Sequence, residues 1–135
     1  MSRKFPLEIK SPDGKNLIDQ AEILNVRLTD GEVGILYGHL PMIGVIDISH
    51  FDYLKDGKTY EFAISGGILN VTKDKVMVLA DSFESREEID ISRAKEAEKR
   101  AQELIDKAKD NRQIDIKRAE LALRRALNRL SLTNK

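Results

Sequence analysis

Residues that interrupt helices are confined to the first half of this chain, and this uneven distribution constrains the fold more than any other feature. All 8 Gly lie between Gly14 and Gly67, and all 3 Pro lie before residue 42. From residue 68 to residue 135, no residue breaks a helix through its backbone geometry. The last aromatic residue is Phe83. We therefore expect two modules, of which only the second is helical.

Charge divides the chain in the same way. Residues 1–85 carry 9 Lys and Arg against 13 Asp and Glu, a net charge of −4. Residues 86–135 carry 14 against 10, a net charge of +4, so the whole chain is neutral. A neutral chain is not a polyelectrolyte suited to nucleic acid or anionic lipid. We expect two domains, 1–85 and 86–135, joined near residues 82–88.

The first domain has the sequence pattern of β-structure. Apolar and polar residues alternate in residues 24–29, which is the period of a half-buried strand. Alternate residues of the segment 76–80 are apolar and fall on one face. Turn signals separate the apolar runs, most clearly at Asp56-Gly57, a dipeptide typical of tight hairpins. Short strands at this spacing predict an antiparallel β-sandwich or barrel.

The second domain has the pattern of two helices. Asp90 and Asp115 can each cap a helix start, because a carboxylate accepts hydrogen bonds from the free N–H groups of the first turn. Asp110-Asn111 is the turn expected between the helices. After each cap, small and apolar residues recur at spacings of three and four, as in an amphipathic helix. They are Ala94, Ala97, Ala101, Leu104, Ile105 and Ala108 in the first helix, and Ala119, Ala122, Leu123, Ala126, Leu127 and Leu130 in the second.

These apolar positions predict an antiparallel helical hairpin of low stability. A short connection places consecutive helices antiparallel. Alanine allows the helices to approach closely but buries little area, since each buried CH₂ contributes only about 0.8 kcal/mol. The hairpin is expected to be only marginally stable alone.

Arginines form a second pattern on the predicted helices. Arg93 and Arg100 are seven residues apart and share a face, as do Arg118, Arg125 and Arg129. A guanidinium group offers planar, paired donors that suit phosphate or carboxylate oxygens. The simplest interpretation is a basic, solvated face. Two sharper interpretations are an anionic small ligand bound between the helices and docking onto an acidic protein surface.

The sequence lacks the residues of the common catalytic and metal sites. The absence of Cys excludes disulfides, thiolate metal sites and Cys nucleophiles, and the 2 His are too few for a zinc site without carboxylate help. There is no P-loop and no Gly-x-Ser-x-Gly motif. No apolar run approaches the roughly 18 residues of a membrane span. We therefore expect no catalytic residue, no metal and no required cofactor.

Four segments together resemble the epsilon-subunit family of bacterial F-type ATP synthases, over essentially the whole chain. Residues 30–41 are similar to the family's G-E-x-G-x-L-P-G-H-x-P loop. Residues 65–71 resemble its S-G-G-x-L-x-V strand, residues 87–94 its I/L-D-x-x-R-A segment and residues 117–130 its last helix. Tyr37 departs from the pattern, because the family usually has Pro at this position.

The resemblance implies an α+β fold of two modules, a ten-stranded β-sandwich followed by an α-helical hairpin. It also implies a non-catalytic rotor subunit of the central stalk, which binds the gamma subunit and touches the c-ring. Members of the family couple rotation to proton or sodium flow and restrain ATP hydrolysis by the alpha and beta subunits. The implied location is the cytoplasmic face of the bacterial plasma membrane, with no insertion into it.

The resemblance further implies a regulatory ATP site and a set of partner contacts. In some relatives the hairpin binds ATP, and the corresponding positions here are Glu84, Ile89, Asp90, Arg93, Ala94, Arg100, Arg125 and Arg129. Asp90 is expected on the base or sugar side, or as a helix cap alone, because a carboxylate repels phosphate. Partner contacts are expected at Glu32, Tyr37 and His39 in the loop and at Arg118 and Arg124 in the last helix.

Two other functions are weighed against this one. One is a free-standing ATP sensor without rotor attachment, and the other is a nucleic-acid-binding module with a basic helical hairpin. Neutral net charge, the absence of aromatic residues after Phe83 and the many acidic residues of the hairpin argue against nucleic acid.

Overall fold

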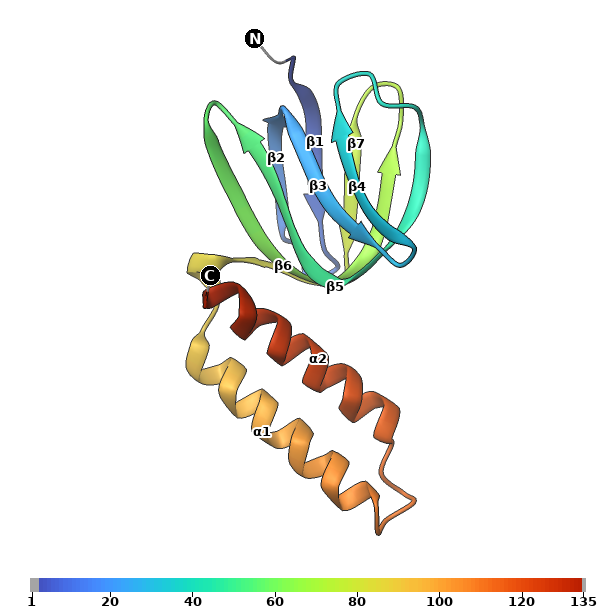
Figure 1. Cartoon of the computed structure of the whole chain (residues 1–135), viewed down its shortest axis with the longest axis vertical. Coiled ribbons are helices and arrows are strands. Elements are labelled where there is room, and N and C mark those ends of the chain that lie inside the picture. The colour runs from blue at the N-terminus through green and yellow to red at the C-terminus, as the bar shows by residue number, and fades with distance from the viewer. Residues whose placement is uncertain (1–2, 135) are drawn as a thin grey trace. The chain divides into compact units, whose positions relative to one another are not determined.

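The computed structural model describes residues 3–134, and the chain folds as two compact units that divide after Ser85 (Figure 1). Within the described residues the first unit has eight strands. They are β1 (Phe5–Lys10), β2 (Asn16–Ala21), β3 (Ile23–Leu28), β4 (Gly31–Leu36), β5 (Met42–Lys55), β6 (Lys58–Val71), β7 (Val76–Ala80) and β8 (Phe83–Ser85). The second unit consists of the 3₁₀ turn η1 (Arg86–Glu88) and the helices α1 (Ile91–Ala108) and α2 (Ile116–Thr133).

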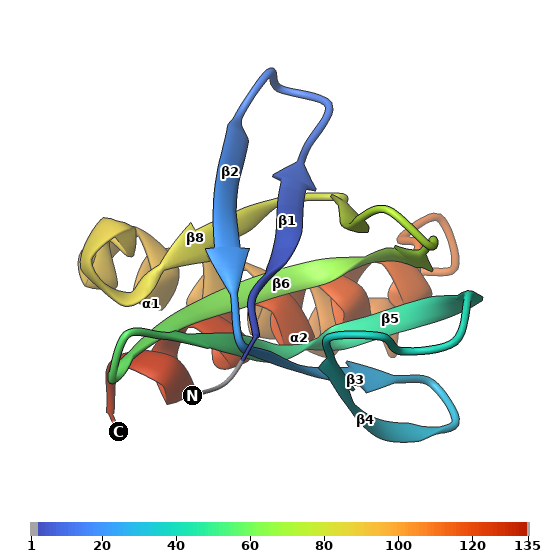
Figure 2. The same cartoon turned by 90° about the horizontal axis from the view of Figure 1, so that it is seen from above.

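The strands form a β-sandwich in which two long strands belong to both layers. The strand order is β2-β1-β7-β6-β5-β3-β4, and β8 also pairs with β6. β6 pairs with β8 through residues 62–64 and with β7 through residues 67–71. Figure 2 shows the β1–β2 hairpin running across the direction of β5 and β6. The predicted sandwich is confirmed.

The strand count and one pairing differ from expectation. The ten strands implied by the resemblance become eight within residues 3–134, because β5 and β6 each run for 14 residues without interruption. One pair departs from the predicted antiparallel arrangement, since β1 lies parallel to β7. A parallel pair requires a long crossover connection, and here the five intervening strands supply it.

A tight hairpin turn connects the two long strands. Asp56 has a φ of 50° and Gly57 a φ of 79°. Two consecutive positive φ values are those of a type I′ turn, whose twist matches that of the flanking strands. The hairpin predicted at this dipeptide is therefore confirmed, and it fixes the register in which Lys55 faces Lys58.

The core of the sandwich lies between its layers. Val76 and Val78 are buried and Met77 is only partly buried, as the alternation predicts. Phe51 stacks on Phe62 with 4.9 Å between ring centroids. The fully buried large side chains of this unit are Leu7, Ile9, Leu24, Ile35, Phe51, Tyr53, Ile64, Leu69 and Val78.

A partly buried polar contact joins β2 to β5. The Tyr53 hydroxyl donates to Asp19 Oδ2 at 2.8 Å, and Lys55 Nζ donates to Asp19 Oδ1 at 2.6 Å. Burial opposes ionisation of Asp19, but these two hydrogen bonds outweigh it and hold the pKa of its carboxyl below the ordinary value. Burial, and then the Asp19 carboxylate, raise the pKa of the Tyr53 hydroxyl well above its ordinary value.

Both helices of the second unit begin at the predicted caps. Asp90 accepts a hydrogen bond from the Arg93 N–H, and Asp115 accepts one from the Arg118 N–H, each at 3.1 Å. Both cap residues have extended backbone geometry, as N-caps require. The connection covers residues 109–115, and α1 packs against α2 as an antiparallel pair (Figure 1). Within the described residues, no helix is both long and apolar enough to span a membrane.

Alanine lines the line of contact between α1 and α2, which we call the seam, as predicted. Fewer residues are buried in the seam than expected. Ala94, Ala101, Ala119 and Ala126 are at most 3% exposed. Leu104 and Leu127 were expected in the seam but are 44% and 45% exposed, which corrects that prediction. The physical reason is that close approach through Ala limits the fully buried contact to the alanine positions, so that larger side chains such as Ile105 and Leu123 lie at its margin and are only partly buried.

Candidate functional site

The β4–β5 loop is held by a four-residue turn. The His39 N–H donates to the Leu36 carbonyl oxygen at 3.1 Å, and Gly38 has a φ of 80°. In its Nδ1–H tautomer, the His39 ring donates to the Leu40 carbonyl oxygen at 2.7 Å. The half-buried His39 thus shapes the loop, which agrees with a role in loop packing.

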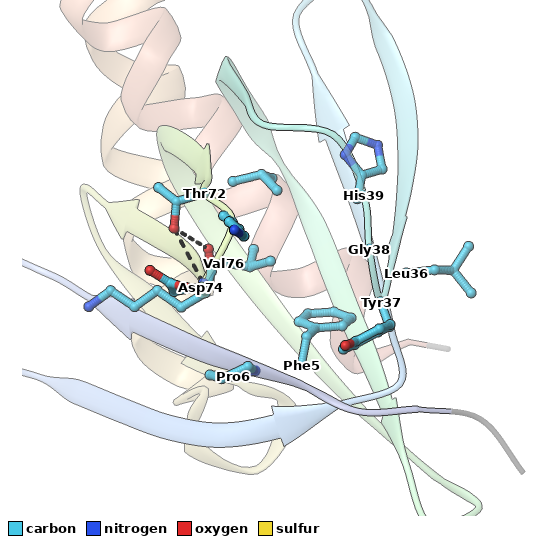
Figure 3. Close-up of a pocket in the computed structure, with 12 residues that line it drawn as sticks. Phe5, Pro6, Leu36, Tyr37, Gly38, His39, Thr72, Asp74 and Val76 are labelled. Atoms are coloured by element: carbon cyan, nitrogen blue, oxygen red, sulfur yellow. Dashed lines mark hydrogen bonds between the residues drawn. The ribbon is translucent and has the colours of Figure 1, made fainter.

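A pocket of about 260 Å³ lies behind this loop (Figure 3). Tyr37 and His39 line it from the loop, and Phe5 and Pro6 line it from the start of β1. The β6–β7 turn, residues 72–75, closes another side. Tyr37 is 54% exposed and therefore also faces solvent. Two of the predicted partner residues, Tyr37 and His39, are brought together here.

The third predicted partner residue of the loop region lies on a neighbouring surface. Glu32 is exposed on β4, directly opposite Arg27 of β3. β4 is an edge strand of the sheet, because the strand order ends with it. Glu32 is therefore an exposed residue of an edge strand, and it does not line the pocket.

The sandwich carries an exposed apolar patch next to the loop. Val45 faces Ile68 across β5 and β6, and Ile68 faces Leu79 across β6 and β7. Ile43 precedes Val45 by two residues and shares its face. These four side chains, which we call the outer patch, are 74% (Ile43), 53% (Val45), 37% (Ile68) and 42% (Leu79) exposed. Contiguous exposed apolar surface of this kind marks an interaction site.

Sequence reasoning missed the outer patch. The apolar residues of β5 to β7 point to both faces, so alternation alone does not tell which face is covered. The register of the three strands is needed to show that the exposed residues form one row. The only signal in the sequence is that strands such as 43–46 carry apolar side chains on both faces.

Seven of the eight residues predicted to bind ATP lie in the helical unit, and Glu84 lies in β8 of the sandwich. Ile89 is 8% exposed, and Ala94 packs in the seam. Asp90 is the cap of α1, so its predicted cap role is confirmed. The four remaining positions are arginines, two exposed on α1 (Arg93, Arg100) and two half-buried on α2 (Arg125, Arg129).

The helix geometry places the arginines on the same side of the hairpin. Arg93 and Arg100 each directly precede a buried alanine of α1, and Arg118 and Arg125 each directly precede a buried alanine of α2. One residue corresponds to about 100° of rotation, in the same sense for both helices. On two antiparallel helices, residues that precede a contacting residue by the same number of positions point to the same side of the helix pair. The arginines of both helices therefore border one face.

This face has the chemistry of an anion site. Arg129 follows Arg125 by four residues and lies on the same face of α2. Guanidinium groups on both helices can neutralise phosphate charge and donate paired hydrogen bonds. The two predicted partner residues of α2 differ in position: Arg118 borders this face, whereas the exposed Arg124 directly precedes Arg125 and points elsewhere.

Comparison with protein families gives matches over both units. Residues 4–86 match the beta-sandwich domain of the ATP synthase delta/epsilon chain, and residues 87–134 match its long alpha-helix domain. An ATP synthase epsilon chain of Bacillus cytotoxicus is 44% identical over 133 residues, which cover 98% of each chain. One of Priestia megaterium is 42% identical over 100 residues, 74% of this chain and 75% of the relative.

A solved structure has the same fold. It is a chain in a cryo-EM structure of the Euglena gracilis mitochondrial ATP synthase that comprises OSCP, F1 and the c-ring. The TM-score is 0.80 at 19% sequence identity, and the alignment covers 97% of this chain and 82% of that one. At this identity the similarity concerns the fold.

Proposed function

The chain belongs to the delta/epsilon family of ATP synthase subunits, and its relatives are epsilon chains, which are non-catalytic. From this premise we propose a function for each of its two units. The sandwich attaches the subunit to the central stalk by binding gamma and touching the c-ring. The helical unit restrains ATP hydrolysis and binds ATP as a regulatory ligand. The subunit thereby couples rotation to ion flow at the cytoplasmic face of the membrane.

The outer patch carries the proposal for attachment. Val45, Ile68 and Leu79 form one exposed row across three strands, and Ile43 extends the row toward the β4–β5 loop. On that loop Leu40 is 79% exposed. A few residues that become fully buried at the centre of an interface supply most of its affinity. An apolar helical segment such as a stalk subunit offers is a fitting partner for the patch.

Attachment is tested by placing a charge in the outer patch. Ile68→Glu should weaken binding to purified gamma at least tenfold, because a carboxylate would be buried without a partner. Ile18→Glu is a matched control, since Ile18 is also an exposed isoleucine of the sandwich but lies on β2, outside the patch. Equal affinities of the two variants in surface plasmon resonance would refute this surface as the gamma contact.

The arginine face supports ATP as the regulatory ligand. Two arginines of α1 and two of α2 border the same side, so one polyphosphate can neutralise charges on both helices. The most deeply buried side chains along the seam beneath them are the alanines Ala94, Ala101, Ala119 and Ala126. A ligand that binds both helices stabilises the folded hairpin by RT ln(1 + [L]/Kd), about 2.7 kcal/mol at a hundredfold excess over Kd. For a thinly packed hairpin this is a large effect.

ATP binding is tested on the full chain by limited proteolysis and calorimetry. Millimolar ATP should protect the connection and the helices from cleavage, and Arg93→Ala should abolish this protection. Lys95→Ala is the matched control, because Lys95 is exposed on the same helix but directly follows Ala94 and so lies on the opposite side of the seam. If calorimetry detects no heat of binding with millimolar ATP, the ligand role is refuted.

Inhibition of hydrolysis is proposed for α2 in an opened form. α2 carries five Lys and Arg against a single acidic residue, Glu120. A helix of this charge suits acidic surfaces, and its binding should weaken with salt. ATP favours the closed hairpin, so high ATP should release the inhibition.

A further inference from the structure

The turn at the tip of the β4–β5 loop, residues 36–39, has no proline at its second position to fix the backbone. Gly38, with a φ of 80°, has the backbone conformation that a type II turn requires at its third residue. The second position of such turns favours proline, because the pyrrolidine ring fixes φ. Tyr37 occupies that position here. The φ angle at this position is therefore not fixed by a proline ring, and contacts of the Tyr37 side chain are needed to restrain the loop backbone.

The Tyr37 side chain is held by a cation from the N-terminal segment. The guanidinium carbon of Arg3 lies 5.1 Å from the centre of the Tyr37 ring. This is within the distance of about 6 Å at which a cation is attracted to an aromatic face. Arg3 itself precedes Phe5, which is 5% exposed and fixes the start of β1 in the core. Figure 3 shows Phe5 and Tyr37 side by side at the pocket.

We propose that Arg3 is a positioning residue for the β4–β5 loop, which it holds through the ring of Tyr37 in place of a turn proline. Leu36, the first residue of this turn, and Leu40, which directly follows it, are 54% and 79% exposed. A fixed turn presents both side chains to a partner without an ordering cost on binding. The effect on partner affinity rests on the proposed rotor attachment, whereas the effect on the loop does not.

The loop itself gives the first test. The His39 amide is protected by its hydrogen bond to Leu36, so its hydrogen exchange, measured by NMR on the full chain, reports opening of the turn. Arg3→Ala should raise the exchange rate about two- to fivefold, the factor that an exposed cation–π contact corresponds to. Arg3→Lys should restore much of the protection. Lys4→Ala removes the adjacent cation, which pairs with Asp56 at 2.6 Å, and should change nothing.

A second substitution separates this role from general stabilisation. Tyr37→Pro fixes the backbone without the ring, so Arg3→Ala should no longer affect His39 exchange in that background. Binding to purified gamma with the c-ring should weaken about two- to fivefold in Arg3→Ala alone. The proposal is overturned if Arg3→Ala matches Lys4→Ala, or if Tyr37→Pro leaves the effect of Arg3→Ala unchanged. A wild-type chain that does not bind the rotor would instead refute the proposed function, and the exchange rates would still decide this proposal.

Discussion

Replacing Gly67 by alanine is expected to destabilise the sandwich, because the backbones of β6 and β7 approach too closely there for a side chain. A Cβ atom at Gly67 would lie 2.9 Å from the Ala80 Cα, and closer still to the Leu79 carbonyl oxygen. Ordinary contacts begin near 3.4 Å, and the tightest contact, with the Leu79 carbonyl oxygen, means that β7 would have to move by about 1 Å. These neighbours are main-chain atoms, which do not turn aside as a flexible side chain would.

The size of the effect follows from what this movement disturbs. Overpacking of a well-packed site costs about 1–3 kcal/mol. Separation of the strands also weakens ladder hydrogen bonds at the pair Gly67 and Ala80, each contributing about 1 kcal/mol. We expect a loss of about 2–4 kcal/mol. At about 4–8 °C per kcal/mol for a unit of this size, the loss corresponds to a fall in melting temperature of roughly 8–32 °C.

Tyrosine fluorescence measures this unit alone, because residues 86–135 contain no aromatic residue. The matched control is Gly34→Ala, whose Cβ would lie 3.5 Å from Asn25 Oδ1, an ordinary contact. The control should stay within about 0.5 kcal/mol of the wild type. If the two variants unfold at the same temperature, the close approach of β6 and β7 at Gly67 does not exclude a side chain, and the reasoning above is wrong.

Two further predictions concern charged groups. The pKa of Asp19 is lower in the folded state, so its contribution to stability is present above its unfolded pKa of about 3.9 and is lost as pH falls through the folded value. Asp19→Asn should therefore lower the urea midpoint at pH 7 and make the midpoint decline less steeply toward pH 3. If the decline is the same in the variant as in the wild type, the Asp19 contact does not contribute in this way. Replacing Arg118 and Arg124 by Gln should raise the ATP hydrolysis rate of a reconstituted complex severalfold at low ATP, with less effect at high salt; equal rates in variant and wild type would argue against the inhibitory role of α2.

Local chemistry predicted much of the fold. The hairpin at Asp56-Gly57 depends on a backbone preference that two residues carry themselves, and the helix caps at Asp90 and Asp115 depend on one carboxylate each. These features need no partner far away in the sequence. The parallel pairing of β1 with β7 could not be predicted in this way, because it joins segments more than sixty residues apart.

The candidate surfaces were predictable to different degrees. Spacing alone found the arginines, because on a helix sequence distance determines the face. Spacing failed for Leu104, since helical periodicity does not tell how closely two helices approach. The outer patch and the contact of Arg3 with Tyr37 both depend on strand register and on loops that meet in space, and neither has a local signature. The predicted ATP ligands stay a prediction.

The most direct test of the whole account is the affinity for the rotor of a chain that ends at Ser85, compared with the full chain. Residues 1–85 form a compact unit that contains the loop, the pocket and the outer patch. We predict that this shortened chain binds purified gamma with the c-ring as tightly as the full chain, within about threefold, and that it does not restrain ATP hydrolysis. A shortened chain that is folded by tyrosine fluorescence but does not bind would contradict the assignment of attachment to the sandwich.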